Sequence, residues 1–306
     1  MRIAITGANG FLGSHLVDAA LARGHEVVGA VRRPHELAER DGCRWVHGDL
    51  SDPASLEAAF ASCDAVIANA ALAPGRRGAS AEAFYEANVK GTRAQVEAAA
   101  DAGVGRVVYV STVAVYRTRL MRAMGEASPR FDPLKRGFDW NQFTTHPEYA
   151  TSKAAAEMAV WDASAHRGTA LTALRAGPLY GPGDHKMVAR YVDMLNRRVP
   201  SAPTVAVPHL HGRDAADAAI ASAERPQTAG RAYNLAGPSV SVWRAVRALG
   251  RELGRGPVVP LPVPLRVAFD DRAARRDLGF TPRGVTTGMR DTAAWWAAQR
   301  PGDVRR

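Results

Sequence analysis

The sequence predicts an α/β protein with a Rossmann-type, doubly wound parallel sheet and a smaller C-terminal lobe. Three observations predict this class. Apolar runs alternate with helical patterns through the first 175 residues, as in parallel strands joined by helical crossovers. A glycine-rich turn follows the first apolar run. After Arg175, frequent prolines interrupt the alternation, which favours a smaller and less regular lobe.

The apolar runs predict where the strands lie. They fall near residues 2–6, 26–31, 43–47, 64–68, 105–111 and 169–175. Helical periodicity separates them, for example over residues 80–102 and 149–165.

The turn after the first strand carries the most informative pattern. Glycines at positions 7, 10 and 13 follow the run that begins at Ile3, and an amphipathic helical pattern begins at Ser14. Glycines at such a turn allow a tight bend and let the backbone approach a pyrophosphate, which the helix N-terminus attracts. The spacing is GxxGxxG rather than GxGxxG. The turn predicts a dinucleotide site formed by Gly7, Asn9, Gly10, Phe11, Leu12 and Gly13.

This site divides the chain into two expected domains. Residues 1–176 form an NAD(P)-binding Rossmann domain, to which segments near 204–235 return. Residues 177–306 form a smaller substrate-binding lobe. Together they make one compact unit.

The ends of the second and third strands bear on cofactor choice. NAD-preferring enzymes usually place an acid at the end of the second strand, where this chain has Arg32 and Arg33. Guanidinium groups suit a 2′-phosphate, so NADP is preferred over NAD, the alternative being a solvated pair. Asp49 is expected to bond adenine and Asp52 to cap a helix ahead of Pro53.

Three residues form the candidate catalytic group. Tyr149 and Lys153 are four residues apart at the start of a predicted helix and therefore share a face. An ammonium beside a phenol lowers the phenol pKa, so Tyr149 is expected to exchange a proton while nicotinamide exchanges hydride. Thr112 ends the 105–111 run, where it either bonds the same substrate oxygen or simply terminates the strand.

Composition excludes several other classes. The chain has 306 residues and a formal net charge of +10 spread over scattered arginines, without a dense basic run for nucleic acid. No apolar run approaches the roughly 18 residues that span a bilayer. Two isolated cysteines, Cys43 and Cys63, indicate a reducing, cytoplasmic setting. We expect a small-molecule substrate and no nucleic-acid partner, membrane partner or metal site, and we leave a homodimer open.

These motifs together resemble the extended short-chain dehydrogenase/reductase superfamily, in its NAD-dependent epimerase/dehydratase branch. The similarity covers nearly the whole chain, including the segments 6–13, 48–50, 69–71, 88–92, 111–116, 175–183, 211–214 and 278–282. It implies that Tyr149 is the acid/base, that Lys153 lowers its pKa and holds the nicotinamide ribose, and that Thr112 positions the substrate oxygen. It also implies further cofactor-site residues, namely Leu50, Ala70, Ala71, Asn88, Ser111 and Pro178, with Asn88 acting as a support.

The sequence departs from parts of the family pattern. Val113 and Ala114 stand where dehydratases carry an acidic pair. Pro178 replaces an asparagine common in nucleotide-sugar epimerases, and Val207 and Pro208 lie where an arginine for the diphosphate is usual. The residues that could substitute for this arginine are Lys186, Arg190 and Arg197.

The segment after the catalytic strand also departs. Arg117 replaces a usual glycine, and residues 117–146 form a long aromatic and cationic stretch. This stretch predicts either a substrate-covering loop or a flap packed on the smaller lobe.

The functional prediction is hydride transfer between NAD(P) and a carbonyl or secondary alcohol. A nucleotide-sugar epimerase is the first alternative. A non-catalytic regulator that senses the dinucleotide is the second.

Overall fold

A seven-stranded parallel sheet lies at the centre of the computed structural model, which describes residues 1–73, 80–117, 119–131 and 147–299. The strands are β1 (Arg2–Thr6), β2 (Glu26–Val31), β3 (Cys43–His47), β4 (Ala65–Ala68), β5 (Arg106–Thr112), β7 (Ala170–Ala176) and β12 (Arg231–Leu235). Their order is β12-β7-β5-β4-β1-β2-β3, and it reverses between β1 and β4. The predicted doubly wound parallel sheet is therefore confirmed. Each strand predicted from an apolar run lies within one residue of its expected bounds.

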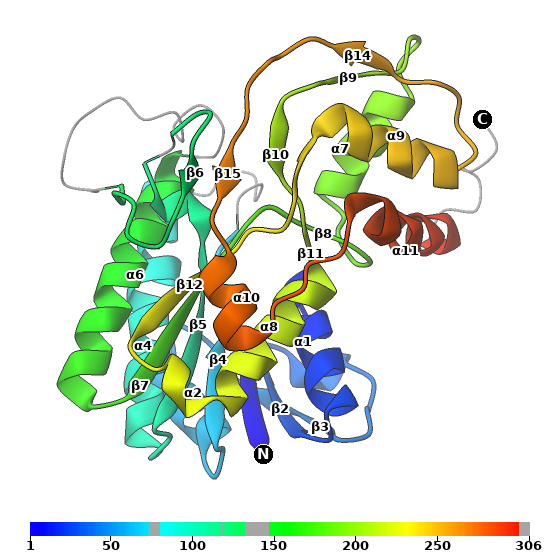
Figure 1. Ribbon diagram of the computed structural model, residues 1–306. Helices are drawn as coiled ribbons and strands as arrows, with labels where there is room; N and C mark the ends of the chain where they lie inside the picture. The colour runs from blue at the N-terminus through cyan, green and yellow to red at the C-terminus, as the bar shows by residue number, and fades with distance from the viewer. Residues whose placement is uncertain (74–79, 118, 132–146, 300–306) are drawn as a thin grey trace.

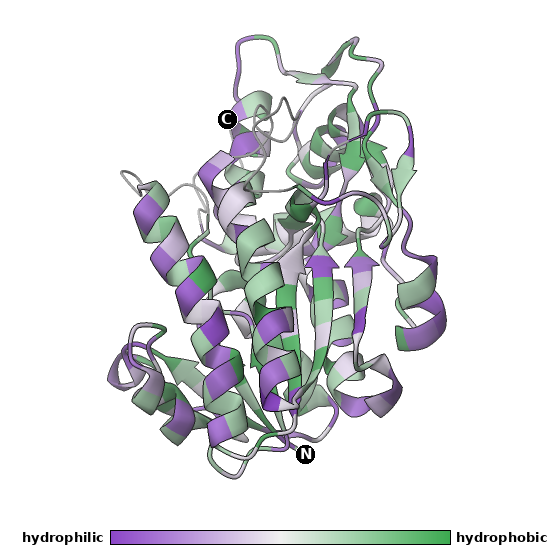
Figure 2. Ribbon diagram, turned by 90° about the vertical axis from the view of Figure 1, so that its left-hand side faces the viewer, coloured by the Kyte–Doolittle hydropathy of each residue, from purple (hydrophilic) through white to green (hydrophobic). Residues whose placement is uncertain are grey.

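Helices cover both faces of this sheet. One face carries α1 (Phe11–Ala22), α8 (Gly212–Glu224) and α10 (Arg272–Leu278), and the other carries α2 (Pro53–Phe60), α4 (Gly91–Asp101) and α6 (Pro147–Arg167). In Figure 1, α4 and α6 lie to the left of the strands, with α1 and α8 to the right. Figure 2 looks from the side of α4 and α6 and shows hydrophilic residues along their outer surfaces, with hydrophobic residues through the strands behind. The sheet is thus the middle of three layers.

One sheet strand comes from late in the chain. β12 pairs in parallel with β7, with Tyr233 opposite Leu174, and α8 before it packs beside α1. Both elements fall in the stretch near 204–235. The division into domains of residues 1–176 and 177–306 stays a prediction.

The helical pattern over residues 80–102 forms three joined elements. They are α3 (Ala81–Phe84), a π-helical segment η2 (Tyr85–Lys90) and α4. A π-helical turn holds an extra residue, and such turns are frequent at functional sites. Here it contains the fully buried Asn88.

The smaller lobe has a core of its own. It is formed by α7 (Met187–Leu195), α9 (Val242–Glu252) and α11 (Val285–Gln299). Short strands pair around it: β9 (Ser201–Pro203) with β14 (Val259–Leu261), β10 (Ala206–Pro208) with β13 (Ser239–Ser241), β8 (Leu179–Tyr180) with β11 (Leu210–His211), and β6 (Ala123–Met124) with β15 (Ala268–Phe269). Single 3-10 turns complete the described elements: η1 (Pro34–Glu36), η3 (Val113–Val115) and η4 (Pro226–Thr228). Within the described ranges, no helix is both long enough and apolar enough to cross a membrane.

Candidate functional site

The glycine turn brings α1 into close contact with the end of β1. Gly7 has a φ of +61°, and a Cβ there would lie 3.2 Å from the Cα of Ala70. Gly13 is enclosed more tightly, because a Cβ at this position would lie 2.1 Å from the carbonyl oxygen of Gly7. These approaches leave space only for hydrogen at both positions.

The N-terminus of α1 is open for an anion. Gly10 precedes the helix, which has no side-chain cap and no acidic residue in its first turn. Asn9 and Gly10 are exposed, Phe11 is half-buried and Leu12 is buried in the core. Uncapped N–H groups beside a bare glycine backbone fit the pyrophosphate of a dinucleotide.

Charged residues gather beyond the carboxyl ends of β2 and β3. Arg32 and Arg33 are both exposed, and Arg33 Nη1 donates to Glu36 Oε1 at 2.8 Å. The backbone and hydroxyl of Ser51 donate to Asp49 and lower the pKa of its carboxyl, with a smaller contribution from the charge of Arg32. Arg32 and Asp49 therefore lie close together at this end of the sheet.

The loop after β3 also prepares the next helix. The predicted cap of α2 is confirmed, because Asp52 Oδ1 accepts from Ser55 N at 3.3 Å and Pro53 is the first helical residue. Leu50 packs against Gly91, where a Cβ would lie 2.8 Å from that of Leu50. Asp49 Oδ1 accepts both the Ser51 backbone N–H and the Ser51 hydroxyl, at 2.9 and 2.8 Å.

Thr112 and Tyr149 meet at the carboxyl end of β5. Thr112 is the last residue of the strand, Tyr149 lies in the first turn of α6, and their side chains are hydrogen-bonded. Thr112 Oγ1 also accepts from Ala114 N at 3.2 Å, which caps η3. The ring of Phe84 packs edge-on against Tyr149 with centroids 6.2 Å apart. Two hydroxyls are thus held together at the sheet edge where ligands of parallel α/β sheets bind.

Lys153 lies one helical turn further along α6 and is almost fully buried. Its Nζ donates to the Val110 carbonyl at 3.0 Å and lies 4.5 Å from the centroid of the Tyr109 ring. Burial lowers the pKa of Lys153 to about 7, while the charge of Glu157 acts in the opposite direction.

The pKa of Tyr149 differs from the expectation. The sequence predicts that Lys153 lowers it, whereas burial raises the pKa of Tyr149 to about 12, opposed only by the hydrogen bond with Thr112. The reason is desolvation: the phenolate would lose water here. The Lys153 ammonium is itself desolvated and bonded to Val110.

Two residues predicted to contact the cofactor have their side chains bonded within the protein. Asn88 donates both amide hydrogens, to the Leu72 carbonyl at 3.1 Å and to Ser152 Oγ at 2.9 Å, and it accepts from Leu72 N at 2.7 Å. Ser111 Oγ donates to Glu157 Oε2 at 2.6 Å. Asn88 therefore ties the loop after β4 to α6, and Ser111 ties β5 to α6.

The remaining predicted cofactor residues lie at the same edge of the sheet. Ala70 N donates to Thr6 Oγ1 at 2.9 Å after β4, and the neighbouring Ala71 is exposed. Pro178 follows β7 and is exposed, with its carbonyl accepting from Leu210 N at 2.9 Å.

The basic residues considered for phosphate binding belong to the smaller lobe. Lys186 and Arg190 are exposed at the start of α7, and Arg197 Nη1 approaches the Ser201 carbonyl at 3.5 Å. Val207 lies in β10, opposite Val240 of β13.

The long 117–146 segment is described only in part. Residues 118 and 132–146 lie outside the described residues, and with them most of the predicted loop or flap. Of the rest, Met124 is buried and packs with Phe131 and Phe269. This part is held by pairing of β6 with β15.

Sequence reasoning missed Glu157. It is fully buried on α6, four residues after Lys153, and forms an ion pair with Arg175 of β7 at 2.5 Å. The signal was available, because Tyr149, Lys153 and Glu157 recur at helical spacing. Arg175 stood in a quoted motif without a role.

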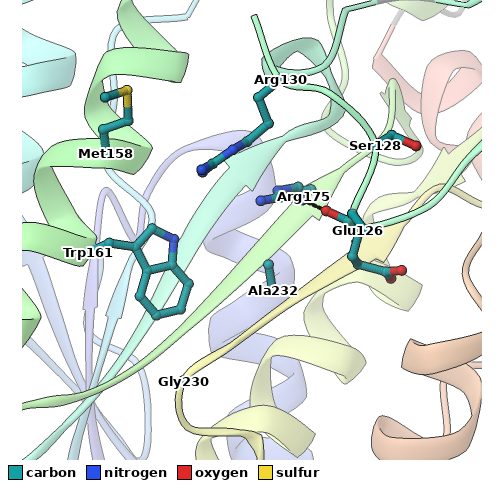
Figure 3. Close-up of a pocket in the computed structure, with 9 residues that line it drawn as sticks. Glu126, Ser128, Arg130, Met158, Trp161, Arg175, Gly230 and Ala232 are labelled. Atoms are coloured by element: carbon teal, nitrogen blue, oxygen red, sulfur yellow. Dashed lines mark hydrogen bonds between the residues drawn. The ribbon is translucent and has the colours of Figure 1, made fainter. Parts of the chain in front are cut away.

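A cavity of about 610 Å³ lies on the other side of this ion pair. Figure 3 shows Arg130 and Arg175 reaching into it from a loop and a strand, opposite Met158 and Trp161 of α6. Its lining includes neither Thr112 nor any other predicted catalytic residue.

Comparison with known proteins gives a consistent result. A family model, NAD dependent epimerase/dehydratase family, matches residues 3–236. The 2-alkyl-3-oxoalkanoate reductase of Stenotrophomonas maltophilia is 35% identical over 193 residues, which cover 63% of this chain and only 55% of that protein. Cinnamoyl-CoA reductase 1 of Oryza sativa is 31% identical over 252 residues, covering 75% of this chain and 69% of that protein.

Solved structures share the fold over the full length. The dTDP-glucose 4,6-dehydratase of Streptomyces venezuelae, crystallised with NAD, is 26% identical with a TM-score of 0.79, and the similarity covers 98% of each chain.

Proposed function

The chain belongs to the NAD dependent epimerase/dehydratase family of extended short-chain dehydrogenases/reductases, and from that membership we propose that it transfers hydride between a nicotinamide cofactor and a carbonyl or secondary alcohol. The observation that carries the proposal is the Tyr149–Thr112 contact at the carboxyl end of β5, with buried Lys153 one turn away. Tyr149 exchanges the proton on the substrate oxygen, and Thr112 orients that oxygen.

The ionisation of the site favours reduction over oxidation. With its pKa raised to about 12 by burial, the Tyr149 phenol holds its proton at neutral pH and can give it to a carbonyl oxygen. When bound, the reduced nicotinamide supplies hydride to the carbonyl carbon. Lys153, already directed to this edge by Val110 and Tyr109, would hold the ribose.

The substrate proposed is a carbonyl compound with an apolar body. Val113 and Ala114 follow Thr112 and carry no group that transfers protons. Val113, Val115 and Met124 belong to an apolar cluster behind this edge. The two curated relatives named above are reductases. These observations support a small or medium apolar ketone or aldehyde over a charged nucleotide-sugar.

The alternative of a nucleotide-sugar substrate has support of its own. MoeE5, solved with UDP-glucose and NAD, is 27% identical with a TM-score of 0.78 over 98% of this chain. We expect weak or absent binding of UDP-, GDP- and dTDP-sugars, because Pro178 and Val207 offer no polar partner for a diphosphate. Calorimetric titration of the cofactor-loaded protein measures this directly. A micromolar dissociation constant for one of these sugars would favour the epimerase instead.

The cofactor proposed is NADP in preference to NAD, although the named structural neighbour contains NAD. Arg32 and Arg33 are exposed near Asp49, and the surface pair of Arg33 with Glu36 is of a weak kind that a phosphate can displace. We expect NADPH to bind more tightly than NADH by about 1–3 kcal/mol. Changing both arginines to alanine should remove most of this preference, as measured by fluorescence titration.

The control for that titration is Arg44→Ala. Arg44 is also exposed but lies near the start of β3, at the opposite end of the sheet. Its replacement should leave the ratio of affinities unchanged. Equal affinities for the two cofactors in the unmodified protein would refute the preference.

A further inference from the structure

One face of α6 is bonded residue by residue to the end of β5. Lys153 donates to the Val110 carbonyl at 3.0 Å, and Glu157 accepts from the Ser111 hydroxyl at 2.6 Å. The Tyr149 contact with the next strand residue completes the series. Helical spacing of four thus matches three consecutive strand positions, and Glu157 is the end of the series furthest from the substrate edge.

Glu157 is an ionised carboxylate inside the protein. Burial alone would raise its pKa, but hydrogen bonds and charge from Arg175, with Ser111 and Arg130, hold the pKa of the Glu157 carboxyl below its usual value. Arg175 Nε donates to both carboxylate oxygens at 3.1 and 3.2 Å. Arg130 Nη1 donates to Oε1 at 3.2 Å.

Arg175 is itself fixed from its other side. Its Nη1 donates to the Tyr116 hydroxyl at 2.6 Å and to the Glu126 carbonyl at 3.0 Å. The Tyr116 hydroxyl in turn donates to Asn234 Oδ1 of β12 at 2.7 Å. Figure 3 shows Arg175 bonded to the Glu126 backbone, with Arg130 extending toward it. Glu157 therefore cannot turn away from Ser111 without breaking contacts that reach across three strands.

The charge of Glu157 acts on Lys153. The groups that face the Lys153 ammonium are Tyr149 and Glu157 on its own helix and the Tyr109 ring on β5. Glu157 is the one charge that raises the pKa of Lys153 against the effect of burial. Without it, an ammonium with 2% of its surface exposed would lose its proton more readily.

We propose that Glu157 is a positioning residue for Tyr149 and Lys153: its carboxylate keeps the Lys153 ammonium charged and, through Ser111, fixes the strand end that carries Thr112. The inference rests on the proposed function, because it assumes that Tyr149 and Lys153 serve the reaction. It assigns work to a buried ion pair that would otherwise be only structural.

The test is the pH dependence of kcat/KM for Glu157→Gln, in the reduction direction. Glutamine keeps oxygen and nitrogen at the hydrogen-bonding positions but removes the charge. Lys153 should then lose its proton at lower pH, so the alkaline limb of the profile should move down by about one pH unit. A purely structural role would lower the rate equally at every pH and leave the limb in place, which would overturn the proposal.

Two further variants separate charge from hydrogen bonding. Ser111→Ala keeps the carboxylate, so it should lower turnover without moving the limb. Asp162→Asn removes an exposed carboxylate on the same helix, where it pairs with Arg93 on the surface. It should change neither rate nor limb. A limb that moves as far in either variant as in Glu157→Gln would contradict the assignment.

Stability and the parent proposal are controlled separately. If Glu157→Gln alone leaves Arg175 unpaired and unfolds, Glu157→Gln with Arg175→Gln buries no net charge and should still move the limb down. Cofactor affinity measured across the same pH range gives a second readout, because its alkaline loss should move with Lys153. A Tyr149→Phe variant that stays active would refute the proposed function, whereas an unmoved limb in Glu157→Gln refutes only this inference.

Discussion

Tyr149→Phe should lower turnover by about 100-fold or more while leaving cofactor affinity nearly unchanged. The change removes one hydroxyl, and with it the proton held beside Thr112 at the carboxyl end of β5. The ring and its packing against Phe84 are retained, so the helix start should not move. Steady-state kinetics with an accepted ketone and fluorescence titration with NADPH measure the two quantities in the same preparation.

The matched variant is Tyr85→Phe. Tyr85 is also a tyrosine of this region, but half of its side chain is exposed and it lies in the π-helical segment η2. Its loss of a hydroxyl should be silent. Lys153→Ala should weaken both turnover and cofactor binding, because this ammonium serves the phenol and the ribose. Full activity of Tyr149→Phe on the physiological substrate would mean that another group carries the proton.

Local sequence was sufficient for the frame of the site. The glycine turn, the strand bounds and the cap at Asp52 depend on residues within one turn of each other, and the family match confirms the resemblance inferred from them. The same holds for Tyr149 and Lys153, whose helical spacing puts them on one face of α6 wherever that helix packs.

The ionisation of these residues could not be read in the same way. The pKa of Tyr149 rises because α6 packs this phenol against the end of β5, where the phenolate would be desolvated. Lys153 turns to a backbone carbonyl of that strand. Both are consequences of tertiary contact, and a spacing of four residues contains no information about them.

Glu157 shows the same limit at longer range. Its partners Ser111 and Arg175 are 46 and 18 residues away in the chain. Only the pairing of β5 with β7 brings those two residues opposite each other beneath α6. The sequence contained the carboxylate at the right helical position, but the charge that keeps it ionised comes from another strand.

Gly13→Ala should reduce dinucleotide affinity by about 100-fold and lower the free energy of unfolding by about 1–3 kcal/mol. A Cβ at Gly13 would lie 2.1 Å from the Gly7 carbonyl oxygen and 2.8 Å from backbone atoms of Ala8, so the helix itself must move. The N-terminus of α1 would then withdraw from the position in which its N–H groups can meet a pyrophosphate. Fluorescence titration and thermal unfolding measure the two effects.

The control is the same substitution where space is open. At Gly105, before β5, a Cβ would meet no heavy atom within 4 Å, and the backbone is outside the left-handed region. Gly105→Ala should therefore leave both quantities unchanged. The decisive comparison is between the two effects in Gly13→Ala. If stability fell while affinity for the cofactor stayed intact, the turn would be a packing element only, and the dinucleotide would have to bind elsewhere. If both fell together, the closeness of α1 to β1 would be what makes the turn a phosphate site.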